Sequence, residues 1–200
     1  IGGGVIRSNA FKIIQHLGKS FQIPVTTTLM GKSSYNENDH LSLGMLGMHG
    51  TAYANFAVSE CDLLIALGSR FDDRVTGKLE EFACDAEVIH IDIDSAEISK
   101  NRTPQLAIIG DVRKVLLECC KKLRSAPLMD QNQTLNWLKR IYKWKNSYPL
   151  IAKNYTSNIL SPQEAISFVG KTNPNAFFTT DVGQHQMWSA QLINCQLKKW

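Results

Sequence analysis

Residues 61–67 read CDLLIAL, a nearly continuous apolar run that ends at Gly68. In a strand, successive side chains point to opposite faces of the sheet, so this run has apolar side chains on both faces. Strands of that kind occur in parallel sheets, where helices cover each face. The stretch therefore predicts an α/β fold with a parallel sheet.

Strand-like and helix-like segments alternate on both sides of this run. We expect further strands at residues 23–28, 88–94 and 106–109, and helices at 8–21, 51–59, 76–82 and 112–123. Such an alternation predicts a doubly wound parallel sheet with helices on both faces. Ile1 and the three glycines after it read as the last step of a strand and a turn, so we also expect the chain to be a piece of a longer protein.

The pattern changes after Arg124, where residues 125–127 (Ser-Ala-Pro) break the alternation. Residues 133–144 have the period of an amphipathic helix, which is either packed on a neighbour or a solvated connector. Residues 154–159 read as a loop.

A second domain is expected to begin near Ser161. Ser161, Pro162 and Glu164 form the signature of a capping box, which predicts a helix that runs to about Val169. Residues 175–180 (NAFFTT) read as a new strand. We therefore divide the chain into a central domain at residues 1–125, a linker at 126–160 and the beginning of another α/β domain at 161–200.

Composition argues against several classes of protein. The 200 residues are 44% hydrophobic and 20% charged, with a formal net charge of +4, which is ordinary for a globular chain. The basic residues are spread along the sequence and form no stripe for nucleic acid, and no apolar run approaches the length of a membrane span. Five cysteines without a C-x-x-C pair indicate reduced thiols, and Cys61 reads as inert core.

Ligands of open parallel sheets bind at the carboxyl ends of the strands, so the residues after each predicted strand are candidates for a site. Glycine turns there let a ligand approach the backbone, carboxylates accept hydrogen bonds from ribose hydroxyls, and a guanidinium suits phosphate. Together these features predict a crevice for a nucleotide-like cofactor at residues 2–4, 28–31, 68–72, 92–94 and 110–112.

Each of these features also has a plain structural interpretation. Residues 2–4 can be only a turn, because they do not form G-x-G-x-x-G. Residues 92–94 can merely make a strand end polar, and Asp72 and Asp73 between two arginines can be a surface ion-pair cluster of little energy. His49 can be a residue at the entry of a helix. These features by themselves do not identify which cofactor binds. The sequence also contains no motif of a complete catalytic site.

Several segments carry a resemblance to one enzyme family. They are PVTTTLMG (24–31), LGMLGMHGTAYAN (43–55), DLLIALGSRFDDRVTGKLEEFA (62–83), IHIDIDSAEI (89–98), GDV (110–112) and TTDVGQHQMW (179–188). In order, and over nearly the whole chain, they resemble the large catalytic subunit of acetolactate synthase, also called acetohydroxyacid synthase. Residues 99–109 and 125–175 resemble the family only in pattern.

The resemblance implies a thiamine-diphosphate enzyme with three α/β domains, in which residues 1–125 belong to the central, FAD-binding domain. Contacts to FAD would fall on Gly3, Thr28, Leu29, Met30, Gly31, Leu46, Gly47, Met48, His49, Gly68, Ser69, Arg70, Phe71, Asp72, Asp92, Ile93, Asp111 and Val112. Gln184 and His185 would lie near thiamine diphosphate. Asp73 and Arg74 would line the substrate channel, where herbicidal inhibitors of the family also bind.

The implied reaction condenses two pyruvates, or pyruvate and 2-oxobutyrate, to 2-acetohydroxy acids with loss of CO₂. It is the first common step of branched-chain amino-acid biosynthesis, which leads to isoleucine and valine. Because it transfers no net electrons, FAD would be structural. The activating glutamate of the family would precede residue 1 and the Mg²⁺ ligands would follow residue 200. We therefore expect no catalytic residue and no metal ligand in these 200 residues, and no synthase activity from them alone.

The resemblance also implies a homodimer or homotetramer with a small regulatory subunit, in a plastid stroma or a bacterial cytoplasm. Two alternatives stay open. One is another FAD-containing thiamine-diphosphate enzyme, such as glyoxylate carboligase or pyruvate oxidase, against which RFDDRVTGKLEEFA favours acetolactate synthase. The other is a non-catalytic nucleotide-binding or regulatory module. Residues 181–188, which resemble the beginning of a thiamine-diphosphate domain, argue against it, because a free-standing module would not need part of a second site.

Overall fold

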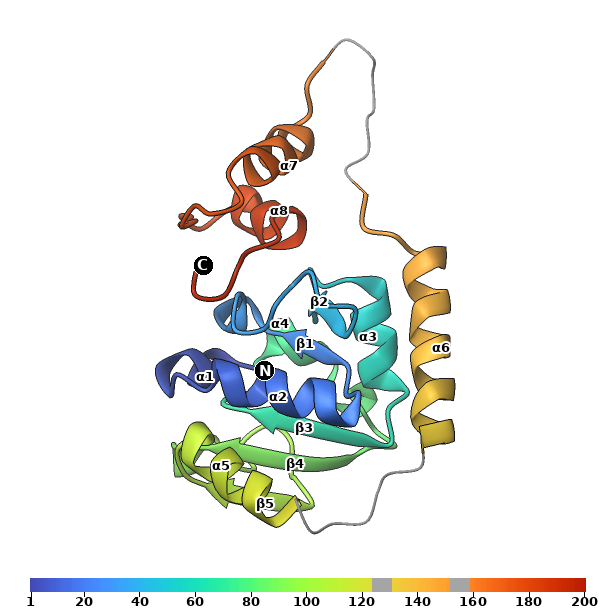
Figure 1. Ribbon diagram of the computed structural model, residues 1–200, viewed down its shortest axis with the longest axis vertical. Coiled ribbons are helices and arrows are strands. Elements are labelled where there is room, and N and C mark those ends of the chain that lie inside the picture. Colours follow the sequence, from blue (N-terminus) through green and yellow to red (C-terminus); the bar gives the residue numbers. More distant parts are fainter. Residues whose placement is uncertain (124–130, 152–158) are drawn as a thin grey trace.

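The computed structural model describes residues 1–123, 131–151 and 159–200. Its strands lie in two parallel sheets (Figure 1), one with the order β1-β2 and one with the order β3-β4-β5. The strands are β1 (Val25–Thr27), β2 (Ser42–Met45), β3 (Leu63–Leu67), β4 (Glu87–Asp92) and β5 (Leu106–Ile109).

Ile1 connects the two sheets. Its amine donates to the Thr26 carbonyl at 2.8 Å, and its carbonyl accepts from the Thr28 amide at 2.9 Å. On the other side, the Gly2 amide donates to the Leu67 carbonyl at 2.9 Å. Ile1 therefore pairs with β1 in the parallel pattern while the next residue reaches β3, and all strands end at one common edge.

Helices follow most of the strands. They are α1 (Gly3–Arg7), α2 (Phe11–Phe21), α3 (Ala52–Ser59), α4 (Asp73–Thr76), α5 (Val112–Leu123), α6 (Gln131–Ser147), α7 (Pro162–Thr172) and α8 (Gln184–Leu192), with short 3₁₀ turns at Leu29–Gly31, Leu79–Glu81 and Ser95–Glu97.

Each face of the sheets has its own hydrophobic core. Ala66 and Val88 point to a core shared with α3 and α6, whereas Leu67 and Ile91 point to a core shared with α1, α2 and α5. Neighbouring residues of β3 and β4 thus enter opposite cores, as the period of a strand requires. The predicted parallel sheet with both faces covered is confirmed.

Helix α6 packs on α3 and is not a solvated connector (Figure 1). Ile141 is 3% exposed, and the Trp144 ring lies 5.7 Å from the Phe56 ring of α3. Lys145 Nζ donates to the carbonyls of His40 and Ser42 at 2.9 and 2.6 Å. An apolar stripe and the half-buried Lys145 therefore fix the helix beside the first core.

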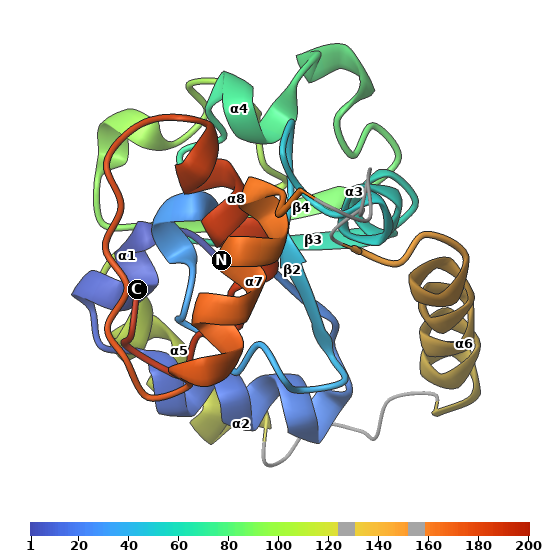
Figure 2. The same cartoon turned by 90° about the horizontal axis from the view of Figure 1, so that it is seen from above.

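Helices α7 and α8 pack on each other and lie over β2 (Figures 1 and 2). The predicted capping box of α7 is present, with Ser161 and Glu164 each accepting from the other residue's amide. The segment after α8 returns to the loop after β1, where the Lys198 amide donates to the Ser33 carbonyl at 3.1 Å. Residues 159–200 are thus connected to the sheets by direct hydrogen bonds.

Several sequence predictions of elements are corrected. The helix predicted at 76–82 is replaced by α4, which begins after the Asp72 cap and ends before Gly77 with its φ of 58°, and by the 3₁₀ turn at Leu79–Glu81. The strand predicted at 175–180 is absent. Among the described residues, the backbone bond that joins it to another segment runs from the Phe178 amide to the Lys199 carbonyl, and a single bond does not make a strand pair. Strand β2 and helix α1 were not predicted.

Two other predictions cannot be compared in full. The break at residues 125–127 lies outside the described residues, as does most of the loop predicted at 154–159. Within the described ranges, no helix is long and apolar enough to cross a membrane.

Candidate functional site

The loops that follow the strands meet at the common edge of the two sheets. Gly3 lies against Met30 of the loop after β1, and the Met48 amide of the loop after β2 donates to the Arg74 carbonyl at 2.9 Å. The Gly68 amide donates to the Ile91 carbonyl at 2.8 Å, which joins the ends of β3 and β4. The structure therefore brings the predicted cofactor loops into one continuous surface.

The glycines of this edge serve loop packing, which corrects the reason given for them from the sequence. A Cβ on Gly68 would lie 2.5 Å from Gly4 Cα, and a Cβ on Gly47 would lie 2.2 Å from the Arg74 carbonyl oxygen. Both glycines have positive φ, 55° and 92°. Their missing side chains let one loop approach another, and the surface that results is what a ligand would meet.

Apolar side chains are exposed on this surface. Met30, Met48 and Ile93 follow β1, β2 and β4 and are 66%, 60% and 69% exposed. Arg70, which follows β3, has a side chain that is 65% exposed. Exposed large apolar side chains suit a partly apolar ligand, and an exposed guanidinium suits a phosphate.

Other predicted contacts are buried, so a ligand could meet them only through their backbone or a single polar atom. Phe71 and Val112 are 3% exposed and belong to the two cores. Thr28, Leu46 and Ser69 are at most 9% exposed, and Gly31 and Gly47 are also buried. Asp92 is 8% exposed, and Leu29 is half-buried at the start of a 3₁₀ turn.

The carboxylates at the strand ends hold local turns. Asp72 Oδ1 accepts from the Val75 amide at 3.2 Å and caps α4, and Asp111 Oδ1 accepts from the Lys114 amide at 3.0 Å at the start of α5. Asp92 Oδ1 accepts from the Asp94 amide at 3.0 Å. Asp92 and Asp111 each use one oxygen in the turn, so the other oxygen can serve a ligand hydroxyl, whereas Oδ2 of Asp72 lies 4.0 Å from Arg70 Nη2.

His90 is a residue of this site that the sequence reasoning missed. It is fully buried on β4, and its Nε2 lies 2.8 Å from the Ser69 carbonyl, while its ring packs edge-on against Phe71 at 5.0 Å. Burial lowers the pKa of His90, although the Ser69 carbonyl and the carboxylates of Asp92 and Glu97 oppose this shift. A neutral His90 that donates from Nε2 therefore supports the loop that carries Ser69, Arg70 and Phe71. A histidine in the middle of an alternating strand was the signal for it.

Asp73 and Arg74 lie in α4, beside the loop after β2. Their side chains are 80% and 71% exposed, and the closest distance between Asp73 Oδ2 and Arg74 Nε is 4.0 Å. The pair between Arg70 and Asp72 has the same distance. Such exposed and loose ion pairs add little to stability, so these side chains are available to a ligand.

Gln184 and His185 are the first two residues of α8, and both are exposed. The His185 ring lies against the backbone of Gly183, where a Cβ would be 2.9 Å away. At the other end of the helix, Gln191 Nε2 donates to the His49 carbonyl at 2.8 Å. The helix that carries Gln184 and His185 is thus fixed to the loop after β2.

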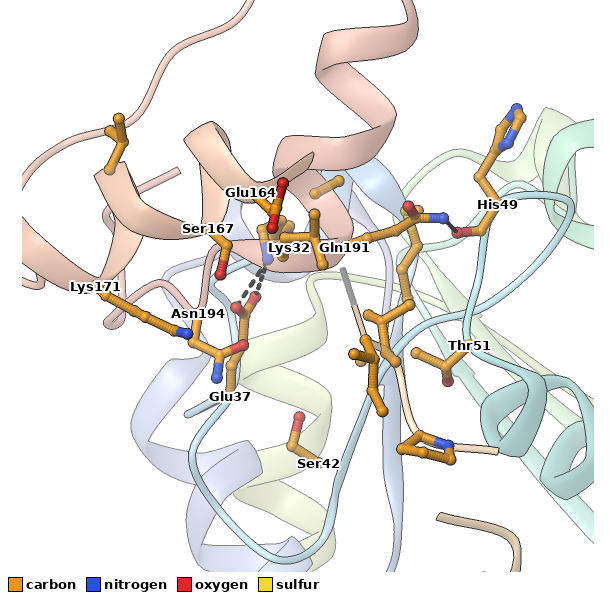
Figure 3. A pocket seen from close by; sticks show the side chains of 18 of the residues that line it. Lys32, Glu37, Ser42, His49, Thr51, Glu164, Ser167, Lys171, Gln191 and Asn194 are labelled. Carbon is orange, nitrogen blue, oxygen red and sulfur yellow. Dashed lines mark hydrogen bonds and ion pairs between the residues drawn. The ribbon is translucent and has the colours of Figure 1, made fainter. Parts of the chain in front are cut away.

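A cleft of about 1010 Å³ lies between β2 and the helices α7 and α8 (Figure 3). It is lined by both apolar and charged residues, among them Lys32, Glu37, His49, Lys145, Glu164 and Phe168. Of the predicted cofactor residues only His49 lines it. The cleft is therefore a separate feature beside the edge where the predicted loops meet.

Residues 1–119, which hold both sheets and the first two thirds of α5, match the family described as "Thiamine pyrophosphate enzyme, central domain". The chain belongs to this family. The matched region contains every predicted flavin contact, together with Asp73 and Arg74. Gln184 and His185 lie beyond it.

Curated relatives are similar to the chain over its whole length. An acetolactate synthase large subunit of Cyanidium caldarium is 60% identical over 100% of the chain and 34% of its own length. One of Parasynechococcus marenigrum is 50% identical over 100% of the chain and 32% of its own length. An acetolactate synthase of Mycobacterium leprae is 45% identical over 97% of the chain and 31% of its own length. The chain spans about a third of the length of these relatives.

Proposed function

We propose that the chain is the central part of an acetolactate synthase large subunit and works within a longer subunit. That subunit would condense two pyruvates, or pyruvate and 2-oxobutyrate, to 2-acetohydroxy acids with loss of CO₂, as a step of branched-chain amino-acid biosynthesis. The observation that carries this proposal is the 60% identity to the large subunit of Cyanidium caldarium over the full chain. The membership of residues 1–119 in the thiamine pyrophosphate enzyme family supports it.

We infer that the edge of the sheets holds FAD. The exposed Met30, Met48 and Ile93 offer apolar contacts for a flat ring system, and Arg70 offers a cation for its phosphates. Asp92 ends β4, where its second carboxylate oxygen can accept from a ribose hydroxyl. The donor set and the apolar surface fit this cofactor.

Thiamine diphosphate would supply the electron sink for the loss of CO₂. The net reaction transfers no electrons, so FAD would be neither reduced nor oxidised overall. Gln184 and His185 are the residues of this chain that we assign to thiamine diphosphate, and the ligands of Mg²⁺ are assigned to other parts of the subunit. Asp73 and Arg74 would face the substrate and the herbicidal inhibitors of such enzymes.

A homodimer or homotetramer with a small regulatory subunit is the assembly that we propose. A plastid stroma or a bacterial cytoplasm would be its compartment. The relatives of red algae and of a cyanobacterium support a source of either kind.

The full-length subunit tests the reaction. With pyruvate, thiamine diphosphate, Mg²⁺ and FAD it should form acetolactate and consume no oxygen. Oxygen consumption with acetyl phosphate or acetate as the product would instead show a pyruvate oxidase.

Flavin binding tests the site. Arg70→Ala should weaken FAD binding roughly tenfold, the equivalent of about 1.4 kcal/mol. Arg113→Ala is the control, because Arg113 is an exposed arginine of α5. Equal FAD affinity of the two folded variants and the wild type would show that the site lies elsewhere.

A further inference from the structure

Lys32 and Glu37 both lie in the loop after β1 and form an ion pair inside the protein (Figure 3). The pair faces the segment after α8. Lys32 Nζ lies 2.9 Å from Glu37 Oε1 and 2.8 Å from Oε2. The two side chains are only 5% and 8% exposed. Both charges have therefore lost most of their contact with water.

Each member of the pair also binds the backbone of the segment after α8. Lys32 Nζ donates to the Ile193 carbonyl at 2.9 Å, and Glu37 Oε2 accepts from the Cys195 amide at 2.8 Å. Ile193 and Cys195 are 4% and 0% exposed. The cation thus meets a backbone acceptor and the anion meets a backbone donor two residues further along.

Burial of two charges costs so much free energy that an apolar pair would often stabilise the same place as well or better. An apolar pair could not satisfy the Ile193 carbonyl and the Cys195 amide. The ion pair is therefore suited to recognise one conformation and one direction of residues 193–195.

The pair joins two parts of the proposed cofactor sites. Lys32 directly follows Met30 and Gly31, whose turn is held by the Thr28 hydroxyl, which accepts from the Gly31 amide at 3.1 Å. Residues 193–195 directly follow α8, which begins with Gln184 and His185. The bond from Gln191 to the His49 carbonyl is a second connection, to the loop after β2.

We propose that Lys32 and Glu37 are positioning residues that hold α8, and with it Gln184 and His185, in register with the flavin loops. The inference rests on the proposed function, because it assigns a purpose to the contact between the two cofactor segments. Neither residue touches a cofactor in this role. Both act through the backbone of residues 193–195.

The test uses the full-length subunit and four variants. Lys32→Met keeps the length of the side chain without its donors, and Glu37→Gln keeps an oxygen for the Cys195 amide. The exchanged pair, Lys32→Glu with Glu37→Lys, restores the opposite charges but presents each to the wrong backbone group. Lys78→Met is the control, since Lys78 forms an ion pair with Glu81 at 2.6 Å in which both side chains are exposed.

Three quantities are measured, namely the Kd of thiamine diphosphate with Mg²⁺, the Kd of FAD, and amide hydrogen exchange of residues 193–200. In Lys32→Met we expect a loss of thiamine-diphosphate affinity of roughly tenfold or more, faster exchange of residues 193–200 and a change in FAD affinity below about threefold. Glu37→Gln should be milder, the exchanged pair should fail to restore binding, and Lys78→Met should match the wild type.

The other outcomes overturn the proposal. Rescue by the exchanged pair would show a general ion-pair effect on stability, and faster exchange with unchanged thiamine-diphosphate affinity would show a purely structural role. Equal loss of both cofactors in Lys32→Met and Glu37→Gln would show that the whole fold depends on the pair. If the wild type bound neither cofactor, the proposed function itself would fail.

Discussion

Gly68 and Gly77 both have a positive φ, 55° and 58°, but only Gly68 is crowded. A Cβ on Gly68 would meet Gly4 Cα at 2.5 Å, whereas a Cβ on Gly77 would have nothing within 4 Å. With its ψ of −125°, Gly77 lies in a region of backbone conformation that is nearly restricted to glycine, so Gly77→Ala should lower the free energy of unfolding by about 1–3 kcal/mol through backbone strain alone. Gly68→Ala should lower it by a further ~1–3 kcal/mol, because two loops must separate.

Urea denaturation of both variants measures this difference. Both variants strain a backbone with positive φ, and only Gly68→Ala must also push two loops apart. Equal losses would mean that the loops at the edge of the sheets tolerate the extra carbon, and that Gly68 is needed only for its φ.

His90 makes the stability of the site depend on pH. Burial lowers its pKa from the ordinary 6.5, so the unfolded chain takes up a proton before the folded chain does. The contribution of neutral His90 is fully present above pH 6.5 and is lost as the pH falls from there toward its folded pKa. Protonation would also place a second N–H donor at Nδ1, which has no partner in the described residues.

We predict that His90→Gln flattens the fall in the free energy of unfolding between about pH 7.5 and pH 5. Gln can still donate to the Ser69 carbonyl but does not titrate. The other titrating groups are common to both proteins, so the difference between the slopes isolates His90. His16→Gln is the control because His16 is exposed on α2. Identical slopes for the wild type and His90→Gln would contradict the prediction.

At the scale of elements, the sequence predicted those whose own residues determine them. The apolar run before Gly68 needs both faces buried, and β3 lies where it was expected. Strand β5 and helix α5 match the predicted residues 106–109 and 112–123. The alternation of Leu41, Leu43 and Met45 would also have predicted β2, but Gly44 weakened the pattern.

Elements that depend on distant partners could not be predicted. NAFFTT has the composition of a strand, yet a strand forms only beside a partner, and Phe177 is 72% exposed. The same limit holds for the site. Strand-end residues follow from the topology, whereas the contact of Lys32 with Ile193 joins residues 161 positions apart and has no sequence signal.

Helix α6 offers a test of element packing. Ile141 is 3% exposed and belongs to the first core, while its neighbour Tyr142 is 66% exposed. Ile141→Ala should lower the free energy of unfolding by about 2–4 kcal/mol, because it leaves a cavity beneath the helix. Tyr142→Ala should change it by less than about 0.5 kcal/mol. Denaturation followed by tryptophan fluorescence reports the transition, since Trp137 and Trp144 lie in this helix.

If both substitutions had small effects, α6 would be bound mainly by Lys145 and by the ion pair between Arg140 and Glu60. Loss of the bonds from Lys145 to the His40 and Ser42 carbonyls would then be the larger perturbation. Lys145→Met distinguishes these cases.

At the scale of the whole molecule, residues 159–200 present an apolar surface. Large apolar side chains are exposed there, namely Ile159, Leu160, Phe168, Val169, Phe177 and Val182. Three of them, Leu160, Phe168 and Val169, line the cleft between β2 and the helices α7 and α8. The chain spans about a third of the length of its curated relatives, and further parts of such a subunit are candidates to cover it.

The 200-residue chain should therefore bind FAD but form no acetolactate. The edge that we propose for FAD is built from residues 3–112, which the two cores hold in place, whereas we assign the activating glutamate and the Mg²⁺ ligands to other parts of the subunit. Flavin fluorescence titration measures the binding, and a colorimetric assay with pyruvate, thiamine diphosphate, Mg²⁺ and FAD measures the product. The full-length subunit is the positive control for both. Acetolactate formed by the purified chain, without a complementing chain, would show that the groups which make the carbon–carbon bond are present within these residues.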